Sequence, residues 1–243
     1  MNEKRLTNQV ALVTGAARRI GRSIALALAE QGADVIVHYR NSKTDADQVV
    51  MEISSAGQRA IACGADLAKK AEITRMFVHV EEVFGRLDIL VNNAGVFSPA
   101  HIEEMAEEQW DSMLNTNLKA QFLCAQAAIP LMRRGGRGRV INVSSIGGLL
   151  AWPRYTHYCV SKAGVIMMTR CLARALAPAI TVNCVAPGTI NFPDEVPDQD
   201  YIRRAPLGRT GNSEDIAAAV SFLAASDFIT GQVIVVDGGR TLT

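Results

Sequence analysis

Tyr158 and Lys162 stand four residues apart, and Ser145 lies thirteen residues before Tyr158. In a helix, residues at positions i and i+4 share one face. Tyrosine titrates near ~10, and a neighbouring ammonium stabilises the phenolate and lowers its pKa toward the working range. A serine hydroxyl beside them can polarise a substrate carbonyl. These residue types at this spacing indicate acid–base catalysis, although a tyrosine and a lysine also occur four apart in helices by chance.

A glycine-rich turn at 14–21 follows the apolar run 10–13, which is typical of a buried parallel strand. A helical pattern continues from the turn until Gly32, which is expected to end it. Strand, glycine turn and helix form the context in which backbone N–H groups bind a pyrophosphate. The spacing differs from Gly-x-Gly-x-x-Gly, and an ordinary turn also uses glycine for its backbone angles, so the turn alone leaves both interpretations open.

Further strand-like runs alternate with amphipathic helical patterns along the chain. The runs are 34–39, 60–63, 87–91, 139–143, 180–185 and 233–236. This alternation predicts a single α/β domain over 1–243, a Rossmann-like doubly wound parallel sheet of about seven strands with helices on both faces. The stretch at about 189–209 has no periodic pattern, and unpatterned loops of this length in compact domains are often lids or binding loops.

The composition narrows the class of protein. A net charge of +1 gives no electrostatic argument for binding nucleic acid or an anionic membrane. No apolar stretch reaches the roughly 20 residues that a membrane helix needs, and no signal-peptide core is apparent. The five cysteines are odd in number and lack metal-ligand spacing, so they are expected to be thiols. A cytoplasmic protein without metal is the resulting expectation.

Several motifs in order along the chain carry a family resemblance. They are Thr14-Gly15 with Gly21, Asn92-Asn93-Ala94-Gly95, Ser145, Tyr158 with Lys162, Pro187-Gly188 and Val236-Asp237-Gly238-Gly239. Together they resemble the short-chain dehydrogenase/reductase family over essentially the whole chain, 9–239. The resemblance implies direct hydride transfer between a nicotinamide cofactor and a substrate carbon, a lid at 189–209, and a homotetramer.

The same resemblance implies roles for four residues. Tyr158 exchanges a proton with the carbonyl oxygen, and Ser145 orients and stabilises that oxygen. Lys162 lowers the tyrosine pKa and holds the nicotinamide ribose. Asn117 holds a water that links Lys162 to solvent, although an asparagine within a helical stretch can equally mark a kink or a buried hydrogen bond. Ser144 is expected to make structural hydrogen bonds instead.

The residues after 34–39 bear on the cofactor. NAD enzymes place a carboxylate there to bind the ribose 2′-hydroxyl, whereas this chain has Arg40, which can pair with a 2′-phosphate. Asn41 and Ser42 are candidates for further hydrogen bonds, and Arg18 in the turn is a second basic candidate. NADP(H) is therefore the preferred cofactor, with NAD(H) possible and solvated surface arginines as the alternative. The turn and the resemblance assign further cofactor contacts to Gly15, Arg19, Ile20, Gly21, Asp66, Leu67, Asn93, Ala94, Gly95, Tyr158, Lys162, Pro187, Gly188 and Ile190.

Departures from the family pattern keep alternatives open. Arg19 replaces a usual glycine, and its side chain must point away from the pyrophosphate; pteridine reductases share this substitution. Those enzymes carry an aspartate where this chain has Ser145, which favours ordinary ketone or aldehyde reduction. The expected function is NADPH-dependent reduction of a ketone or 3-oxoacyl carbonyl to an alcohol. A pteridine-reductase-like activity is the alternative, and a non-catalytic NADP-sensing protein is a third.

The sequence leaves the substrate unidentified. The apolar residues at 149–153 either wall a substrate pocket or pack against the sheet. The four arginines at 133–139 either dock an acidic carrier protein or form a solvated loop. Asn191 and Phe192 stand where the family often has a cofactor-binding threonine, so that contact is in doubt.

Overall fold

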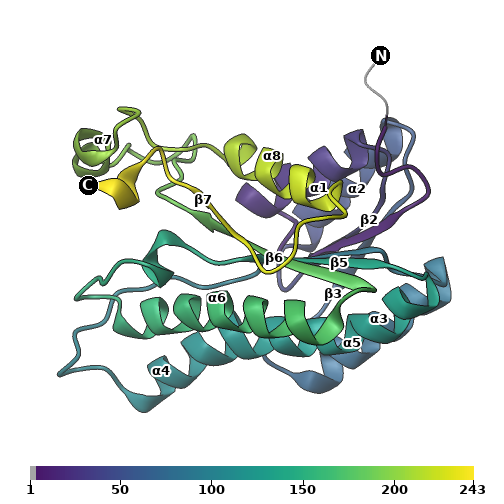
Figure 1. Ribbon diagram of the computed structural model, residues 1–243, viewed down its shortest axis with the longest axis horizontal. Coiled ribbons are helices and arrows are strands. Elements are labelled where there is room, and N and C mark those ends of the chain that lie inside the picture. Colours follow the sequence, from purple (N-terminus) through teal and green to yellow (C-terminus); the bar gives the residue numbers. More distant parts are fainter. Residues whose placement is uncertain (1–3) are drawn as a thin grey trace.

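Seven parallel strands form one sheet in the order β3-β2-β1-β4-β5-β6-β7 (Figure 1). The computed structural model describes residues 4–243. The strands are β1 Val10–Val13, β2 Asp34–Tyr39, β3 Ala60–Gly64, β4 Ile89–Asn92, β5 Gly138–Val143, β6 Ile180–Pro187 and β7 Val233–Val236. The predicted seven-stranded, doubly wound parallel sheet is thus confirmed.

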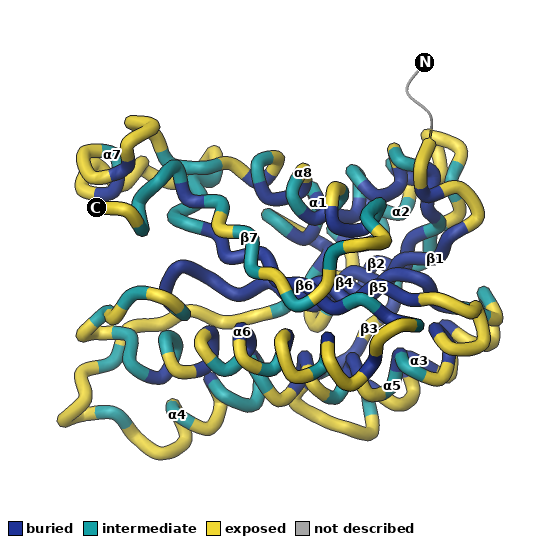
Figure 2. Tube along the Cα trace, viewed as in Figure 1, coloured by how far each residue is buried: buried dark blue, intermediate teal, exposed yellow. Residues whose placement is uncertain are grey.

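Alternating side chains along each strand enter two separate cores, as the period of two in a strand requires. Ala11 and Val13 pack with α1 Arg19–Glu30, α2 Lys43–Ser55 and α8 Ser213–Ala224. Val10 and Leu12 pack on the other face with α3 Lys70–Phe84, α5 Ala120–Arg134 and α6 Thr156–Leu176. Figure 2 shows the sheet as a buried layer between these helices. Burial on both faces explains why the strands read as continuous apolar runs.

Strand order reverses between β1 and β4, and this reversal fixes where a ligand can bind. The chain leaves β1 toward β2 and β3 on one side, and leaves β4 toward β5, β6 and β7 on the other. In open parallel sheets, a crevice forms beyond the carboxyl ends of the strands at such a switch point. The glycine turn follows β1, Asn93 follows β4, Ser145 follows β5 and Gly188 follows β6, so the candidate residues converge on this edge.

The remaining helical elements are short. They are α4 Glu107–Leu114, the π-helical turn η1 Asn115–Lys119, η2 Ile146–Gly148, α7 Gln199–Arg204 and η3 Arg240–Leu242. In Figure 1, α7 lies beside the C-terminus. The buried Tyr201 hydroxyl donates to the Asp237 carbonyl at 2.6 Å, and the Thr243 hydroxyl donates to the Arg204 carbonyl at 2.9 Å. The 189–209 segment is therefore fastened to the residues that follow β7.

Within residues 4–243, the structure contains no helix with the length and apolar character needed to span a bilayer.

Candidate active site

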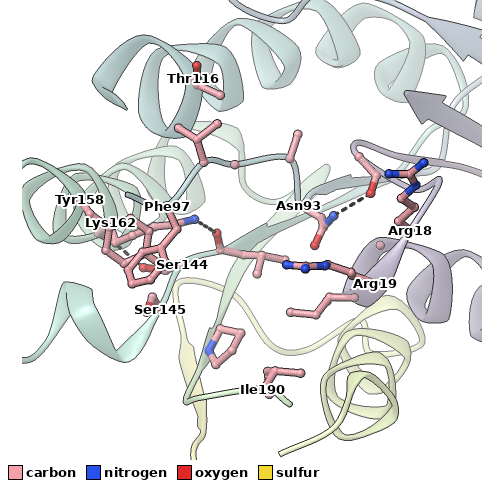
Figure 3. A pocket seen from close by; sticks show the side chains of 18 of the residues that line it. Arg18, Arg19, Asn93, Phe97, Thr116, Ser144, Ser145, Tyr158, Lys162 and Ile190 are labelled. Carbon is pink, nitrogen blue, oxygen red and sulfur yellow. Dashed lines mark hydrogen bonds between the residues drawn. The ribbon is translucent and has the colours of Figure 1, made fainter. Parts of the chain in front are cut away.

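A cavity of about 760 Å³ opens at the carboxyl edge of the sheet (Figure 3). It extends from the glycine turn to the segment that carries Tyr158. Figure 3 shows Arg18 and Arg19 on one side and Ser145, Tyr158 and Lys162 on the other. The predicted site residues that line it are Gly15, Arg18, Arg19, Ile20, Gly21, Arg40, Asp66, Leu67, Asn93, Ala94, Gly95, Ser145, Tyr158, Lys162, Pro187, Gly188 and Ile190.

Two glycines allow the turn to close on itself. Gly15 has φ +63°, and a Cβ there would lie 3.1 Å from Ala94 Cα. A Cβ on Gly21 would lie 2.1 Å from the Gly15 carbonyl oxygen, which no side chain tolerates. These contacts bring the start of α1 against the turn. The result is a backbone cradle at a helix N-terminus, of the kind that binds a pyrophosphate.

Asn93 and Ala94 brace that cradle from β4. The Asn93 amide donates to the Thr14 and Gly15 carbonyls at 2.9 and 3.2 Å. The backbone N–H groups of Asn93 and Ala94 both donate to the Thr14 hydroxyl, at 2.9 and 3.0 Å. Asn93 therefore both lines the cavity and ties β1 to β4.

Basic side chains lie at the far end of the cavity from Tyr158. Arg40 forms an ion pair with Asp66 at 3.5 Å, and Arg18 donates to Asp45 at 2.8 Å. The Arg40 and Arg18 side chains are 62% and 66% exposed, so both guanidinium groups are accessible to an anionic ligand. Asn41 and Ser42 were predicted to assist them, but in the structure they lie outside the residues that line the cavity.

Arg19 reaches across the cavity to the 189–209 segment. Its guanidinium forms an ion pair with Glu195 at 2.8 Å and lies 4.4 Å from the centre of the Phe192 ring. The backbone of Arg19 has φ +53°, a conformation that residues other than glycine adopt rarely. Arg19 thus contributes to the cavity wall, and the expectation that its side chain points away from a pyrophosphate stays a prediction.

Ser145, Tyr158 and Lys162 gather at the other end, because η2 and α6 pack closely there. The Ser145 hydroxyl accepts a hydrogen bond from the Gly147 N–H at 3.0 Å. Lys162 is 4% exposed, and its ammonium donates to the Val143 carbonyl at 2.9 Å. The same ammonium lies 5.8 Å from the centre of the Tyr158 ring. Ser144 makes a structural hydrogen bond, donating to the Lys162 carbonyl at 2.8 Å.

Burial controls the titration of this pair. Burial raises the pKa of Tyr158 above its ordinary value, and the Ser145 hydroxyl offsets this in part. Burial also lowers the pKa of Lys162 to about 8. Because burial is the largest influence, the pKa of Tyr158 is raised overall and not lowered as the sequence predicted. Tyr158 is consequently a protonated phenol at neutral pH, which suits a proton donor.

Asn117 lies in the π-helical turn, fully buried. Its amide oxygen accepts from the Val96 N–H at 2.8 Å, and its amide nitrogen donates to the Val96 carbonyl at 2.9 Å and to the Ser161 hydroxyl at 3.2 Å. The side chain is therefore occupied by the loop after β4 and lies behind the cavity wall. π-Helical turns often occur at functional sites. A role for Asn117 in proton relay stays a prediction.

Aromatic rings form a wall beside Tyr158. Phe97 is 57% exposed; it stacks on Tyr155 at 4.5 Å and meets the Tyr158 ring edge-to-face at 4.7 Å. Trp152 lies parallel to Tyr158 at 6.1 Å and also packs against Ile146 and the α7 region. Trp152 thus forms part of the wall and contacts the 189–209 segment, rather than packing against the sheet.

Several residues that line the cavity were not predicted as site residues, among them Phe97, Thr116 and Glu195. Phe97 follows the Asn-Asn-Ala-Gly motif, but no spacing rule places an aromatic ring there. His38 also lines the cavity, although the sequence analysis did not assign it to the site. The four arginines at 133–139 lie away from the cavity, with Arg134 paired to Glu81 at 2.6 Å.

Comparison with known proteins places these features in context. A family model described as Enoyl-(Acyl carrier protein) reductase matches residues 15–241. The 3-oxoacyl-(acyl-carrier-protein) reductase FabG of Staphylococcus epidermidis is 45% identical over 241 residues, covering 96% of this chain and 98% of the relative. The (2S)-[(R)-hydroxy(phenyl)methyl]succinyl-CoA dehydrogenase subunit BbsD of Thauera aromatica is 43% identical and covers 98% of both chains.

A solved structure matches with similar completeness. It is a short chain dehydrogenase from Burkholderia cenocepacia in complex with NADP. Its TM-score is 0.92 at 36% sequence identity, and the match covers 98% of this chain and 99% of the other. The sheet and its helices are thus superimposable on a protein whose crystal contained that dinucleotide.

Proposed function

This chain belongs to the short-chain dehydrogenase/reductase family and is an oxidoreductase, and from that premise we propose that it uses NADPH to reduce a ketone or 3-oxoacyl carbonyl to an alcohol. One observation carries the proposal: a single cavity has an anion-binding cradle and arginines at one end and Ser145, Tyr158 and Lys162 at the other. The whole chain acts as one domain, and residues 189–209 act as its lid.

The cavity fits a phosphorylated dinucleotide. Gly15 and Gly21 leave the floor of the cradle free of side chains, so a pyrophosphate can approach the backbone closely. Arg18 and Arg40 provide positive charge where a ribose 2′-phosphate would lie, and that charge favours NADP(H) over NAD(H). NADPH, when bound, supplies the hydride. Gly188 and Ile190 would enclose its nicotinamide end from the lid side.

Tyr158 donates the proton to the carbonyl oxygen of the substrate. Its buried phenol is protonated at neutral pH, so it is ready to donate. The Ser145 hydroxyl, oriented by the Gly147 N–H, binds the same oxygen. Lys162 stabilises the phenolate left behind and passes a proton back to it. Asn117 serves the relay that connects Lys162 to solvent.

The substrate class follows from the relatives and from the aromatic wall. Both named relatives bear names of thioester-linked acyl groups, one on a carrier protein and one on coenzyme A. Phe97 and Trp152 offer an apolar surface beside Tyr158. We therefore favour a 3-oxoacyl thioester or an apolar ketone over a small polar carbonyl compound.

The test is loss of NADPH absorbance with a panel of 3-oxoacyl thioesters, linear and cyclic ketones, quinones and dihydropterins. Turnover of a ketone or thioester supports the proposal. The variant Tyr158→Phe should lose about 10²–10⁴-fold in kcat, because it lacks the proton donor, while still binding NADPH. Activity of this variant equal to that of the parent would refute the mechanism. NADPH binding without turnover of any panel member would favour an NADP-sensing protein.

Reduction of a dihydropterin is a second candidate. Arg19 occupies the position at which pteridine reductases also carry a basic residue, and the exposed Phe97 ring offers a flat surface for a planar heterocycle. Ser145 argues against it. Turnover of the dihydropterin alone would select this candidate.

A further inference from the structure

His38 lies at the end of β2, between the two loops that flank the arginine end of the cavity. It is 2% exposed, and yet it borders the cavity. Its Nδ1 lies 3.0 Å from the Gly15 backbone nitrogen, and its Nε2 lies 3.0 Å from the Ala65 carbonyl oxygen. One ring therefore contacts the glycine turn on one side and the loop that precedes Asp66 on the other.

The two contacts define the tautomer of the ring. A backbone N–H can only donate, so Nδ1 must be the unprotonated acceptor for Gly15. The proton of a neutral imidazole then resides on Nε2, which donates to the Ala65 carbonyl. Burial lowers the pKa of His38 to about 4, so the ring stays neutral at physiological pH. Both ring nitrogens are thus committed to backbone groups.

The ring joins two strands that are not neighbours in the sheet. β1 and β3 each pair with β2, and the pairing ends at Val13 with Val37 and at Tyr39 with Gly64. Beyond that point the backbone adds two bonds, from the Ala16 N–H to the His38 carbonyl at 2.8 Å and from the Ala65 N–H to the Tyr39 carbonyl at 3.0 Å. His38 extends this connection with its side chain, directly at the cradle.

We propose that His38 is a positioning residue, which fixes the glycine turn relative to the Asp66 loop and so sets the spacing between the pyrophosphate and adenosine parts of the cofactor site. The inference rests on the proposed use of NADPH. A purely packing role would not require both nitrogens to be paired. The buried His157 illustrates this contrast, because its Nδ1 has no hydrogen-bond partner.

Three substitutions distinguish the contributions of the two His38 hydrogen bonds. His38→Asn retains an acceptor near Nδ1, His38→Gln retains a donor near Nε2, and His38→Phe retains the ring without either. His38→Phe leaves the Gly15 N–H and the Ala65 carbonyl without partners, and we expect it to weaken NADPH binding about tenfold. The other two variants should fall between it and the parent. At saturating NADPH, kcat should change less than about twofold, because the variants alter binding but leave the proton donor in place.

A matched control removes a buried side chain elsewhere. Val80 is fully buried in α3 and does not line the cavity, so Val80→Ala should lower the melting temperature without changing NADPH affinity. Equal NADPH affinity in the parent and His38→Phe would overturn the inference. Equal weakening in Val80→Ala and His38→Phe would also overturn it, by assigning the effect to general destabilisation.

Two measurements on the cofactor-free protein separate this inference from the proposed function. Nitrogen-15 NMR should show the Nε2–H tautomer of His38, and the Gly15 amide should exchange slowly in the parent and in His38→Asn but faster in His38→Phe. An Nδ1–H tautomer, or Gly15 exchange that is insensitive to His38→Phe, would overturn the inference whether or not NADPH binds. A parent protein with these signatures that fails to bind NADPH would instead overturn the proposed function.

Discussion

Burial shifts the pKa values of Lys162 and Tyr158 more than either side chain shifts that of the other. The ammonium is held by the Val143 carbonyl, at 2.9 Å, and the phenol is surrounded by aromatic rings. Because loss of hydration disfavours every charged form, the lysine pKa falls to about 8 while the tyrosine pKa rises. At neutral pH the resting site therefore holds a protonated phenol beside a protonated amine, which is the state that the proposed proton donation requires.

Reduction should weaken as the pH rises through about 8. The lysine pKa is lowered, so the protonated form that supports Tyr158 is present below about 8 and is lost above it. The profile of kcat/KM for NADPH, which reports groups of the free enzyme, should show this fall. In Lys162→Arg the guanidinium stays charged, so any remaining activity should lack this inflection. Persistence of the inflection in Lys162→Arg would assign it to another group.

For single residues, the sequence motifs predicted which side chains meet but not the direction of their pKa shifts. Ser145, Tyr158 and Lys162 line one cavity because fixed spacings along η2 and α6 bring them together. The direction of the pKa shifts depends on burial by distant segments, which no spacing reveals. His38 and Phe97 were not predicted as site residues, since their contacts join segments far apart in the sequence.

The strands and the glycine turn were predictable from the sequence, whereas the helix α7 within 189–209 was not. Each predicted strand agrees with the structure to within two residues at each end, because burial on both faces gives uninterrupted apolar runs. The 189–209 segment lacked any pattern, and α7 within it went unpredicted. Its order comes from tertiary contacts, such as the Tyr201 hydroxyl bond to the Asp237 carbonyl.

Replacing Arg19 by glycine should loosen the lid without lowering stability. An arginine at positive φ costs about 1–2 kcal/mol, whereas an exposed ion pair such as Arg19–Glu195 contributes at most about 1 kcal/mol. Arg19→Gly should therefore leave the melting temperature unchanged or raised, while amide exchange around 190–198 becomes faster. Glu195→Gln removes the ion pair with the backbone unchanged, so it should loosen the lid without raising stability. A melting temperature several degrees lower in Arg19→Gly would contradict this estimate.

For the molecule as a whole, exposed apolar side chains on α5 and α6 are compatible with an assembly of several chains. Val160 and Met167 are 43% and 56% exposed on α6, and Phe122 is 42% exposed on α5. Side chains three, four or seven apart on a helix share a face, so Val160 and Met167 lie on one stripe. The sequence anticipated a homotetramer from family resemblance alone, and this stripe is a candidate contact for it.

Light scattering should give four times the mass of one chain. Met167→Glu places a charge on the α6 stripe and should shift the assembly toward smaller species. Met51→Glu is the matched control, since Met51 on α2 is also 56% exposed but lies on the other face of the sheet. A parent protein that elutes as a monomer would refute the tetramer, and equal effects of the two variants would remove α6 from its interface.

The attachment of α7 to the residues after β7 also has a consequence for the order in which the protein is made. Synthesis runs from the amino end, so the cradle, the His38 bridge and the segment bearing Tyr158 all exist before Asp237 and Thr243 are added. Until then, Tyr201 and Arg204 lack the partners that fasten the 189–209 segment. The residues that line the cavity are therefore all made before Asp237, whereas the attachment of the 189–209 segment depends on Asp237 and Thr243.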